Sequence, residues 1–543
     1  MKVAAAIADV LVKEGVEFLF AYPVNPLIEA AAERDIRTVI VRQERTGIHM
    51  ADAFSRLSSG DSIGVFAMQN GPGVENSFGG VAQAYGDSVP ILVVPGGYAR
   101  RLAQVEPNFH AANNFRGITK WAEQLTTPES LPEVMRRAFS QLRNGRPRPV
   151  LVEVPGDLWN AEVADFAYVP STRARFGPDP EAVARAAAML VAAERPVIYA
   201  GQGVHYARAW ADLKDLAELL EAPVMTSLQG KSAFPEDHPL ALGSGGRAFP
   251  RPVTHFLNAS DLIFGIGCSF AATGFGVAMP AGKRIIHATL DPVDLNKDIQ
   301  VELPMAGDAQ LTLRALLGEV RRRLPAPRGR LPKVSAEIGE VKSAWLEQWM
   351  PKLTSTEAPI SPYRVVWDLL HTVDRRNVII THDSGSPRDQ LSPFWEAIDP
   401  LSYIGWGKTT QLGYGLGLAM GAKLARPEKL CINIWGDAAI GFTGMDFETA
   451  VRERIPILSL LFNNFSMAIE IPVMPTSAAK YGATDISGDY AAMARAFGGY
   501  GERITDPAEI VPALKRGIQK TQEGTPVLLE FITEKEYQYS MPR

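Results

Sequence analysis

The fold of this chain is decided by residues 430–464, which read LCINIWGDAAIGFTGMDFETAVRERIPILSLLFNN. An apolar run ends at Gly436-Asp437, a stretch with helical spacing of its apolar residues follows, and a second apolar run ends at Asn463-Asn464. Strand, turn, helix and strand in this order predict a parallel βαβ crossover. The two strands of such a crossover end at one edge of the sheet, where open α/β sheets bind ligands.

Asp437 and Asn464 follow the two predicted strands, so we expect their side chains to lie side by side. A carboxylate, an amide oxygen and exposed turn carbonyls suit a hard octahedral cation such as Mg²⁺ that also holds a phosphate. The pattern therefore predicts a metal-assisted phosphate site. A Rossmann-like crossover that simply has an acidic turn is the alternative interpretation of the same residues.

Composition and charge limit the classes of function. The chain has 543 residues, which is enough for several domains, and its formal net charge of −5 argues against nucleic acid or an anionic membrane as the main partner. Its two cysteines, Cys268 and Cys431, fall in apolar strand-like runs and indicate buried thiols in a reducing compartment. Charged residues interrupt the first apolar run, and no later run is long enough for a membrane span. We therefore expect a cytoplasmic protein.

Short apolar strands alternate with amphipathic helices along the rest of the chain. This alternation predicts an α/β fold made of three doubly wound parallel-sheet domains. Two stretches rich in proline and charged residues, 169–181 and 324–333, are predicted linkers. We expect the domains to cover residues 1–168, 182–323 and 358–543.

The Gly-Asp turn and the later Asn-Asn pair resemble the cofactor signature of thiamine diphosphate (ThDP) enzymes, usually written as GDG, a spacer and NN. Ala438 stands at the third position, as it does in acetolactate synthases. The resemblance to the acetolactate synthase/benzoylformate decarboxylase branch covers nearly the whole chain, with family-like segments at 219–243, 287–299 and 528–542. It implies that the three domains are the PYR, middle and PP domains of the ThDP-binding fold.

A second signal is Glu44, which lies in VRQERTGIHMADAFSR, residues 41–56, after a predicted strand and at the start of a helix. A glutamate at this place usually caps the helix or interacts with its dipole. The resemblance implies instead that Glu44 bonds to the pyrimidine ring of ThDP and drives its proton transfers. A carboxyl group in a dry pocket is expected to have a raised pKa, which suits this role.

The resemblance also implies how the cofactor is held. Asp437, the side chain of Asn464 and the carbonyl of Ser466 are expected to bind Mg²⁺. Backbone groups of Thr410 and Leu412 are expected to hold the aminopyrimidine, with the Leu412 side chain below the thiazolium; acetolactate synthases usually have Met there, and benzoylformate decarboxylases have Leu. The other expected cofactor contacts are Gly71, Gly73, Gly385, Ser386, Gly436, Ala438, Ala439 and Met467.

Two positions are expected to face the substrate. Asn25 lies where acetolactate synthases carry a Gly-Gly pair, and His110 lies where they carry Gln. By position both are expected near the reacting carbon, where each could donate a hydrogen bond to the substrate. A lone histidine in a loop is more often simply solvated, and this alternative for His110 stays open.

The sequence thus predicts an enzyme that uses ThDP and Mg²⁺ to decarboxylate a 2-oxo acid and to join the remaining fragment to a second carbonyl. A non-ligating 2-oxo acid decarboxylase or a carbon–carbon lyase is the alternative within the family, and Asn25 and Leu412 favour it. A catalytically silent ThDP-fold binding protein is a remote alternative, and the presence of Glu44, Asp437 and Asn464 argues against it.

Two further expectations concern FAD and assembly. Acetolactate synthases bind FAD through a middle-domain pattern resembling GxHGT, whereas residues 243–252 here read GSGGRAFPRP, which argues against FAD.

In the family the PYR domain of one subunit faces the PP domain of another. Glu44 and Asp437 of one site are therefore expected to come from different chains. A homodimer is the smallest assembly that allows this, and the resemblance implies a homotetramer, which the family often forms.

Overall fold

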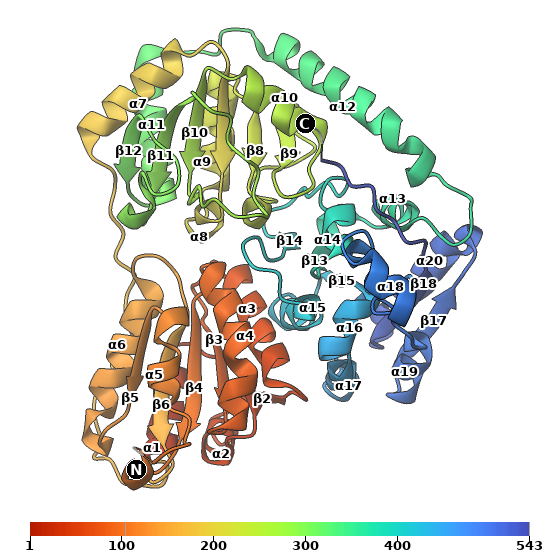
Figure 1. Ribbon diagram of the computed structural model, residues 1–543. Coiled ribbons are helices and arrows are strands. Elements are labelled where there is room, and N and C mark those ends of the chain that lie inside the picture. The colour runs from red at the N-terminus through yellow and green to blue at the C-terminus, as the bar shows by residue number, and fades with distance from the viewer. Residues whose placement is uncertain (104, 542–543) are drawn as a thin grey trace.

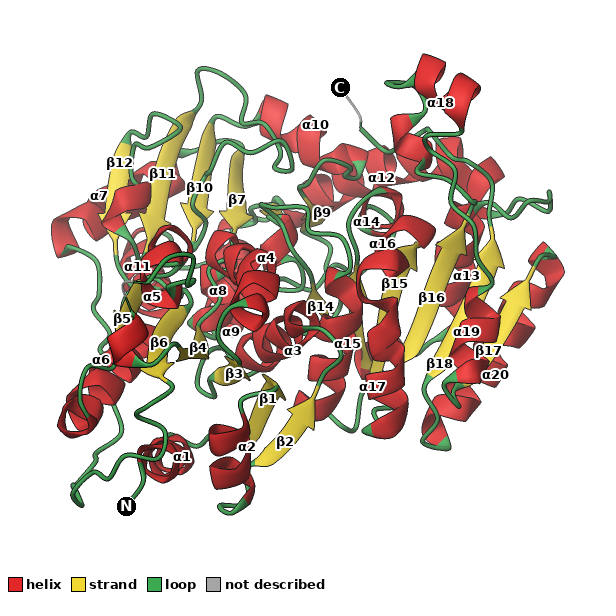
Figure 2. Ribbon diagram, turned by 60° about the horizontal axis from the view of Figure 1, so that its bottom comes forward, coloured by secondary structure: helices red, strands yellow, loops and turns green. Residues whose placement is uncertain are grey.

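A computed structural model describes residues 1–103 and 105–541, whose strands form three separate six-stranded sheets (Figure 1). Within each sheet the paired strands run parallel, and helices pack around them (Figure 2). The predicted α/β class with three doubly wound parallel sheets is confirmed. Several central strands are buried along their whole length, as parallel strands covered on both faces must be.

The first sheet has the strand order β2-β1-β3-β4-β6-β5. Its strands are β1 (Phe18–Tyr22), β2 (Arg37–Ile40), β3 (Gly64–Met68), β4 (Ile91–Gly97), β5 (Trp121–Gln124) and β6 (Val150–Pro155). Its helices are α1 (Val3–Lys13), α2 (Asn25–Ala32), α3 (Glu44–Leu57), α4 (Pro72–Gly86), α5 (Ala111–Asn114) and α6 (Leu131–Arg143). Residues 163–179, which include most of the first predicted linker, contain no helix or strand.

The second sheet has the strand order β12-β11-β10-β7-β8-β9. Its strands are β7 (Pro196–Ala200), β8 (Val224–Thr226), β9 (Ala241–Ser244), β10 (Leu262–Ile266), β11 (Arg284–Thr289) and β12 (Leu303–Ala306). Its helices are α7 (Pro180–Ala192), α8 (Gly203–Tyr206), α9 (Trp210–Leu220), α10 (Arg251–Ala259) and α11 (Ala309–Arg323). A long helix, α12 (Leu331–Leu353), leads to the third sheet; it begins inside the second predicted linker, which is therefore shorter than expected.

The third sheet has the strand order β14-β13-β15-β16-β18-β17. Its strands are β13 (Val378–His382), β14 (Tyr403–Ile404), β15 (Leu430–Gly436), β16 (Leu458–Asn463), β17 (Tyr500–Ile504) and β18 (Val527–Ile532). Its helices are α13 (Pro362–Thr372), α14 (Ser386–Leu391), α15 (Tyr414–Ala425), α16 (Asp437–Thr443), α17 (Phe447–Arg452), α18 (Pro475–Tyr481), α19 (Tyr490–Ala496) and α20 (Ile510–Gln522), with a short 3₁₀ helix, η7 (Gly444–Asp446).

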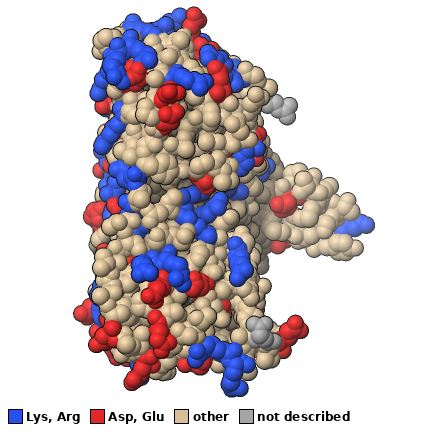
Figure 3. All heavy atoms as spheres, turned by 90° about the vertical axis from the view of Figure 1, so that its left-hand side faces the viewer, with Lys and Arg blue, Asp and Glu red and all other residues tan. Residues whose placement is uncertain are grey.

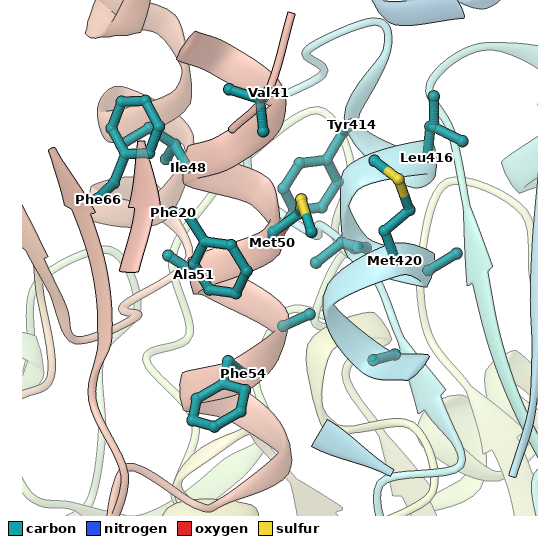
Figure 4. Packing of buried hydrophobic residues seen from close by; sticks show 14 of the residues in the cluster. Phe20, Val41, Ile48, Met50, Ala51, Phe54, Phe66, Tyr414, Leu416 and Met420 are labelled. Carbon is teal, nitrogen blue, oxygen red and sulfur yellow. The ribbon is translucent and has the colours of Figure 1, made fainter. Parts of the chain in front are cut away.

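Helices α3 and α15 join the first and third sheets. Their side chains belong to one buried apolar cluster, in which Met50 of α3 faces Tyr414 of α15 (Figure 4). Two glycines of α15 allow this close approach, because a methyl group at Gly417 would lie 2.7 Å from Thr46 O and one at Gly421 would lie 2.3 Å from Met50 O. The two helices therefore touch through their backbones.

We expect Gly421→Ala to destabilise the protein by about 1–3 kcal/mol, because the added methyl meets backbone atoms that cannot rotate away. Gly318→Ala in α11 is the matched control, since nothing lies within 4 Å of the added methyl there and helix propensity improves. Thermal unfolding of the full-length variants should show a lower midpoint for Gly421→Ala only. Equal midpoints would show that the two helices can separate at little cost.

Candidate functional site

The end of β15 and the end of β16 form the centre of the site. Asp437, the first residue of α16, accepts at Oδ2 the backbone N–H groups of Asn464 and Ser466, each at 3.1 Å. Its Oδ1 accepts the N–H of Ala438 at 2.9 Å. The crossover thus brings together the three residues that the sequence predicts as metal ligands, and Gly436, Ala438 and Ala439 lie in the same turn.

The oxygen atoms of this turn fit a divalent cation. Asn464 Oδ1 is buried and has no hydrogen-bond partner among the described residues, although an amide oxygen normally accepts one. Burial raises the pKa of Asp437 to about 6. Hydrogen bonds from backbone amides, that of Ser466 first, lower the pKa and offset part of this rise. In the described part of the chain no three His, Cys, Asp or Glu side chains gather into a metal site. A cation here would therefore take one carboxylate, amide and backbone oxygens, and oxygens of a ligand such as a phosphate.

A second turn lies beside the first. Gly385, with φ of +82°, precedes α14, and Ser386 is its first residue. A methyl group at Gly436 would lie 3.5 Å from Pro387, so the two turns are neighbours. Ser386 Oγ lies 2.8 Å from Tyr539 Oη in the C-terminal segment. Two of the predicted phosphate contacts thus lie next to the predicted metal ligands.

Asp383, which the sequence analysis did not single out, joins this region to the segment before α15. Its buried carboxylate accepts the N–H groups of Ser384, Gly413 and Gly415 at 2.7–2.9 Å. Burial raises the pKa of Asp383 to about 6. Ser384 Oγ donates to Thr410 O at 3.0 Å. An acidic residue after a buried strand was the available signal, and it is the same signal that drew attention to Asp437.

Segment 409–412 lies against helices of the first sheet. Gln411 Oε1 is 2.8 Å from His49 Nε2, and Thr409 hydrogen-bonds to Gln83. His49 is neutral because burial lowers its pKa to about 3. Leu412 is half-buried next to this contact. The predicted cofactor segment is thus held between the first and third sheets.

Glu44, the first residue of α3, faces Gly73 and Asn76 of α4. Its side chain is buried, and Oε2 accepts the Asn76 side chain at 3.2 Å. A methyl group at Gly73 would lie 3.2 Å from Glu44 Oε1, so glycine leaves room for the carboxylate. Burial raises the pKa of Glu44, and the negative charge of Asp446 raises it further. Within the described part of the chain, no hydrogen bond or ion pair joins Glu44 to Asp437, Asn464 or Ser466.

The predicted substrate-facing residues lie at the carboxyl ends of the first sheet. Asn25 is exposed at the start of α2, and His110 is half-buried just before α5. Gly71 has φ of +62°, and a methyl group there would lie 2.9 Å from the hydroxyl of Tyr98, a neighbour that the sequence analysis missed. Met467 lies in the turn after β16, where its N–H donates to Thr484 O at 2.8 Å. Among the described residues, neither Asn25 nor His110 hydrogen-bonds to Glu44.

A separate cavity of about 400 Å³ lies between the first and second sheets. Its lining includes five basic residues, Arg143, Arg146, Arg173, Arg175 and Lys408. Arg146 forms an ion pair with Asp294 at 2.6 Å. Figure 3 views the molecule from the side of the 163–179 segment and shows basic side chains in the middle of this face. Gly245, within the segment where the FAD pattern was sought, also lines the cavity. The prediction against FAD stays a prediction.

Comparisons with known proteins agree in all three parts of the chain. Residues 1–122 match a family described as "Thiamine pyrophosphate enzyme, N-terminal TPP binding domain", 183–316 match the central domain of such enzymes, and 383–531 match the C-terminal TPP binding domain.

Similar proteins include acetolactate synthase large subunits. A "Probable acetolactate synthase large subunit" of Methanocaldococcus jannaschii is 31% identical, over 98% of this chain and 92% of the relative. One of Methanococcus aeolicus with the same description is 30% identical, over 100% and 93%. The "Acetolactate synthase isozyme 3 large subunit" of Escherichia coli K12 is 27% identical, over 98% and 95%.

The raised pKa of Asp437 predicts a pH-dependent affinity for Mg²⁺ together with a diphosphate. The carboxyl must lose its proton to bind the cation, so the affinity should fall about tenfold per pH unit below about pH 6. Calorimetric titration of the protein with Mg²⁺ and pyrophosphate would measure this, once Mg²⁺ binding to pyrophosphate in buffer has been subtracted. An affinity that stays constant down to about pH 4.5 would fit an aspartate with an ordinary pKa and count against a buried ligand at Asp437.

Proposed function

The chain belongs to the thiamine pyrophosphate enzymes, and on this basis we propose that it decarboxylates a 2-oxo acid and joins the remaining fragment to a second carbonyl, with ThDP and Mg²⁺ as cofactors. The observation that carries the proposal is the turn after β15. There a buried carboxylate lies beside an amide oxygen that has no hydrogen-bond partner in residues 1–103 and 105–541, at the carboxyl ends of two parallel strands. The similarity to acetolactate synthase large subunits over nearly the full length supports carboligation.

In this proposal the third sheet holds the charged end of the cofactor. Asp437, Asn464 Oδ1 and the carbonyl of Ser466 bind Mg²⁺, and Gly385 with Ser386 contacts the diphosphate. The turn after β15 also contains Gly436, Ala438 and Ala439, and the turn after β16 contains Met467. The backbone of Thr410 and the side chain of Leu412 hold the ring end. Bound ThDP supplies a nucleophilic carbon and an electron sink for decarboxylation.

Glu44 is the proposed proton-transfer residue. Burial and a nearby negative charge raise the pKa of Glu44 and so favour its neutral form, which can give a proton to a ring nitrogen of the cofactor. Asn76 donates a hydrogen bond to the carboxyl, which orients it. Gly73 and Gly71 belong to the loop that leaves room for the carboxyl and for the cofactor ring.

Asn25 and His110 are the proposed substrate contacts. They are polar side chains from two different loops at the strand ends of the first sheet. A non-ligating decarboxylase or a carbon–carbon lyase is the second candidate, and Asn25 and Leu412 favour it. The two candidates differ in whether the reacting fragment meets a second carbonyl or a proton.

The products formed from pyruvate with ThDP and Mg²⁺ distinguish the two candidates. We expect acetolactate from a carboligase, whereas acetaldehyde alone would support the second candidate.

Glu44→Gln should still bind ThDP but lose activity by about a hundredfold or more, because general acid–base catalysis is removed. A variant that keeps the full rate would contradict the role of Glu44. Failure to turn over any 2-oxo acid or acyloin would contradict both candidates.

We also propose that two chains complete each site, in a homodimer or a homotetramer of such dimers. No hydrogen bond joins Glu44 to Asp437 within the described part of one chain. Phe442 and Met445, close to the site on α16 and η7, are 47% and 55% exposed, which is unusual for large apolar side chains in a cofactor site. A second copy of the chain would cover them and bring its own Glu44 to this Asp437.

Co-expression of Glu44→Gln and Asp437→Asn chains tests this assembly. In a mixed dimer one site receives both substitutions and the other receives neither, so activity should return although each variant alone is inactive. Roughly a quarter of wild-type activity is expected if the chains pair at random. If both groups of one site belong to the same chain, every site in the mixture carries one substitution and no activity should return.

The compartment is the remaining part of the proposal. Cys268 and Cys431 are buried and unpaired, which fits a reducing compartment, and we propose the cytoplasm. None of the helices in residues 1–103 and 105–541 has the length and apolar character needed to cross a membrane. The proposed partners are the small-molecule 2-oxo acid and other copies of the chain, with no nucleic acid and no membrane.

A further inference from the structure

A carboxylate of the third sheet reaches the turn that precedes Glu44. Asp446, the last residue of η7, is fully buried and accepts the backbone N–H of Arg42 at Oδ1, at 2.7 Å. Thr449 Oγ1 donates to the same oxygen at 2.8 Å and so fixes the rotamer of Asp446. The contact spans 404 positions of sequence and falls where β2 turns into α3.

Neighbouring contacts hold the same turn. Arg452 of α17 donates to Ile40 O at 2.5 Å, and Arg37 donates to Glu453 O at 3.0 Å. Together with Asp446, these contacts bind both ends of β2 and the turn after it to the crossover that begins at Asp437. The start of α3 is therefore set by the third sheet as well as by its own.

We propose that Asp446 is a positioning residue for Glu44, which fixes the turn before it and places a second buried carboxylate beside it. The inference rests on the proposed catalytic role of Glu44. Nothing in it requires that Asp446 touch the cofactor, since it contacts the Arg42 amide and Thr449, with the Thr46 side chain and the Gln43 amide beside it.

Asp446 is the acidic residue whose charge raises the pKa of Glu44. Helix α4 faces Glu44 with Asn76, which is neutral, and the first turns of α3 carry Arg45 and His49. His49 is uncharged, because burial lowers its pKa to about 3. After burial, the negative charge of Asp446 is the other influence that raises the pKa of Glu44. Removing this charge favours ionised Glu44 and must therefore lower its pKa.

Two substitutions separate the charge from the hydrogen bond. Asp446 Oδ2 has no hydrogen-bond partner among the described residues, so an asparagine can keep its oxygen at the Oδ1 position and place its amide nitrogen at Oδ2. Asp446→Asn thus removes the charge and keeps the turn, whereas Asp446→Ala removes both. Glu453→Gln is the matched control, because it removes one negative charge from the same crossover while Glu453 pairs with Arg452 and Arg37.

The experiment uses the full-length, cofactor-free protein and two readouts. Infrared difference titration against Glu44→Gln gives the midpoint of the Glu44 carboxyl, and hydrogen exchange gives the protection of residues 42–46. We expect Asp446→Asn to lower the Glu44 midpoint by about one pH unit with unchanged exchange. Asp446→Ala should in addition speed this exchange about fivefold, and Glu453→Gln should change neither.

The outcomes distinguish the inference from the function on which it rests. An unchanged Glu44 midpoint in Asp446→Asn, or a shift of equal size in Glu453→Gln, would overturn the proposal. Asp446→Asn keeps the test valid if the alanine variant does not fold. If Glu44→Gln retains full activity, the catalytic role of Glu44 fails, but the titration and exchange still report whether Asp446 positions it. A shift in the pH profile of the holoenzyme that follows the Glu44 midpoint would support both.

Discussion

The backbone contact between α3 and α15 is the constraint on which the site depends. Glu44 begins one of these helices, and the Thr410–Leu412 segment leads into the other, so their packing fixes the Glu44 of one proposed site relative to the ring-holding segment of another. A buried group strengthens the contact: Arg56 pairs with Asp52 at 2.6 Å and donates to the Tyr414 hydroxyl at 2.7 Å. Breaking such a pair strands a charge in the interior, which costs far more than a surface ion pair. The helices are thus held in a fixed register.

Buried carboxylates organise the loops around this helix pair. Asp437, Asp383 and Asp446 each accept backbone N–H groups where a strand or turn leaves donors without partners. Asp87 does the same for Gly407 and Lys408, and also accepts a hydrogen bond from the side chain of Gln229, which lies in the turn after β8. The burial that fixes these loops also raises the pKa of the first three carboxyls. Structural order and proton or metal chemistry therefore arise from the same arrangement.

The sequence predicted well what is local and strongly patterned. The crossover from β15 to β16 was readable because its strands are long, apolar and followed by Asp437 and Asn464. Short edge strands such as β5, half-buried throughout, and the two-residue β14 carry little apolar pattern that could predict them. Asp383 and Asp446 were missed for another reason. Their partners lie 30 and 404 positions away, and no spacing rule connects an acidic residue with a distant backbone amide.

Asp437 and Asp446 stand at the two ends of one short stretch, formed by α16 and η7. Under the proposed assembly, this stretch serves two sites at once. Its first residue binds the metal of one site, and its last residue holds the turn before the Glu44 that reaches into the other. The hydrogen-bonded turns of α16 and η7 set the separation between the two residues. An insertion or deletion between Ala439 and Asp446 would therefore disturb the cation at one site and the proton-transfer group at the other.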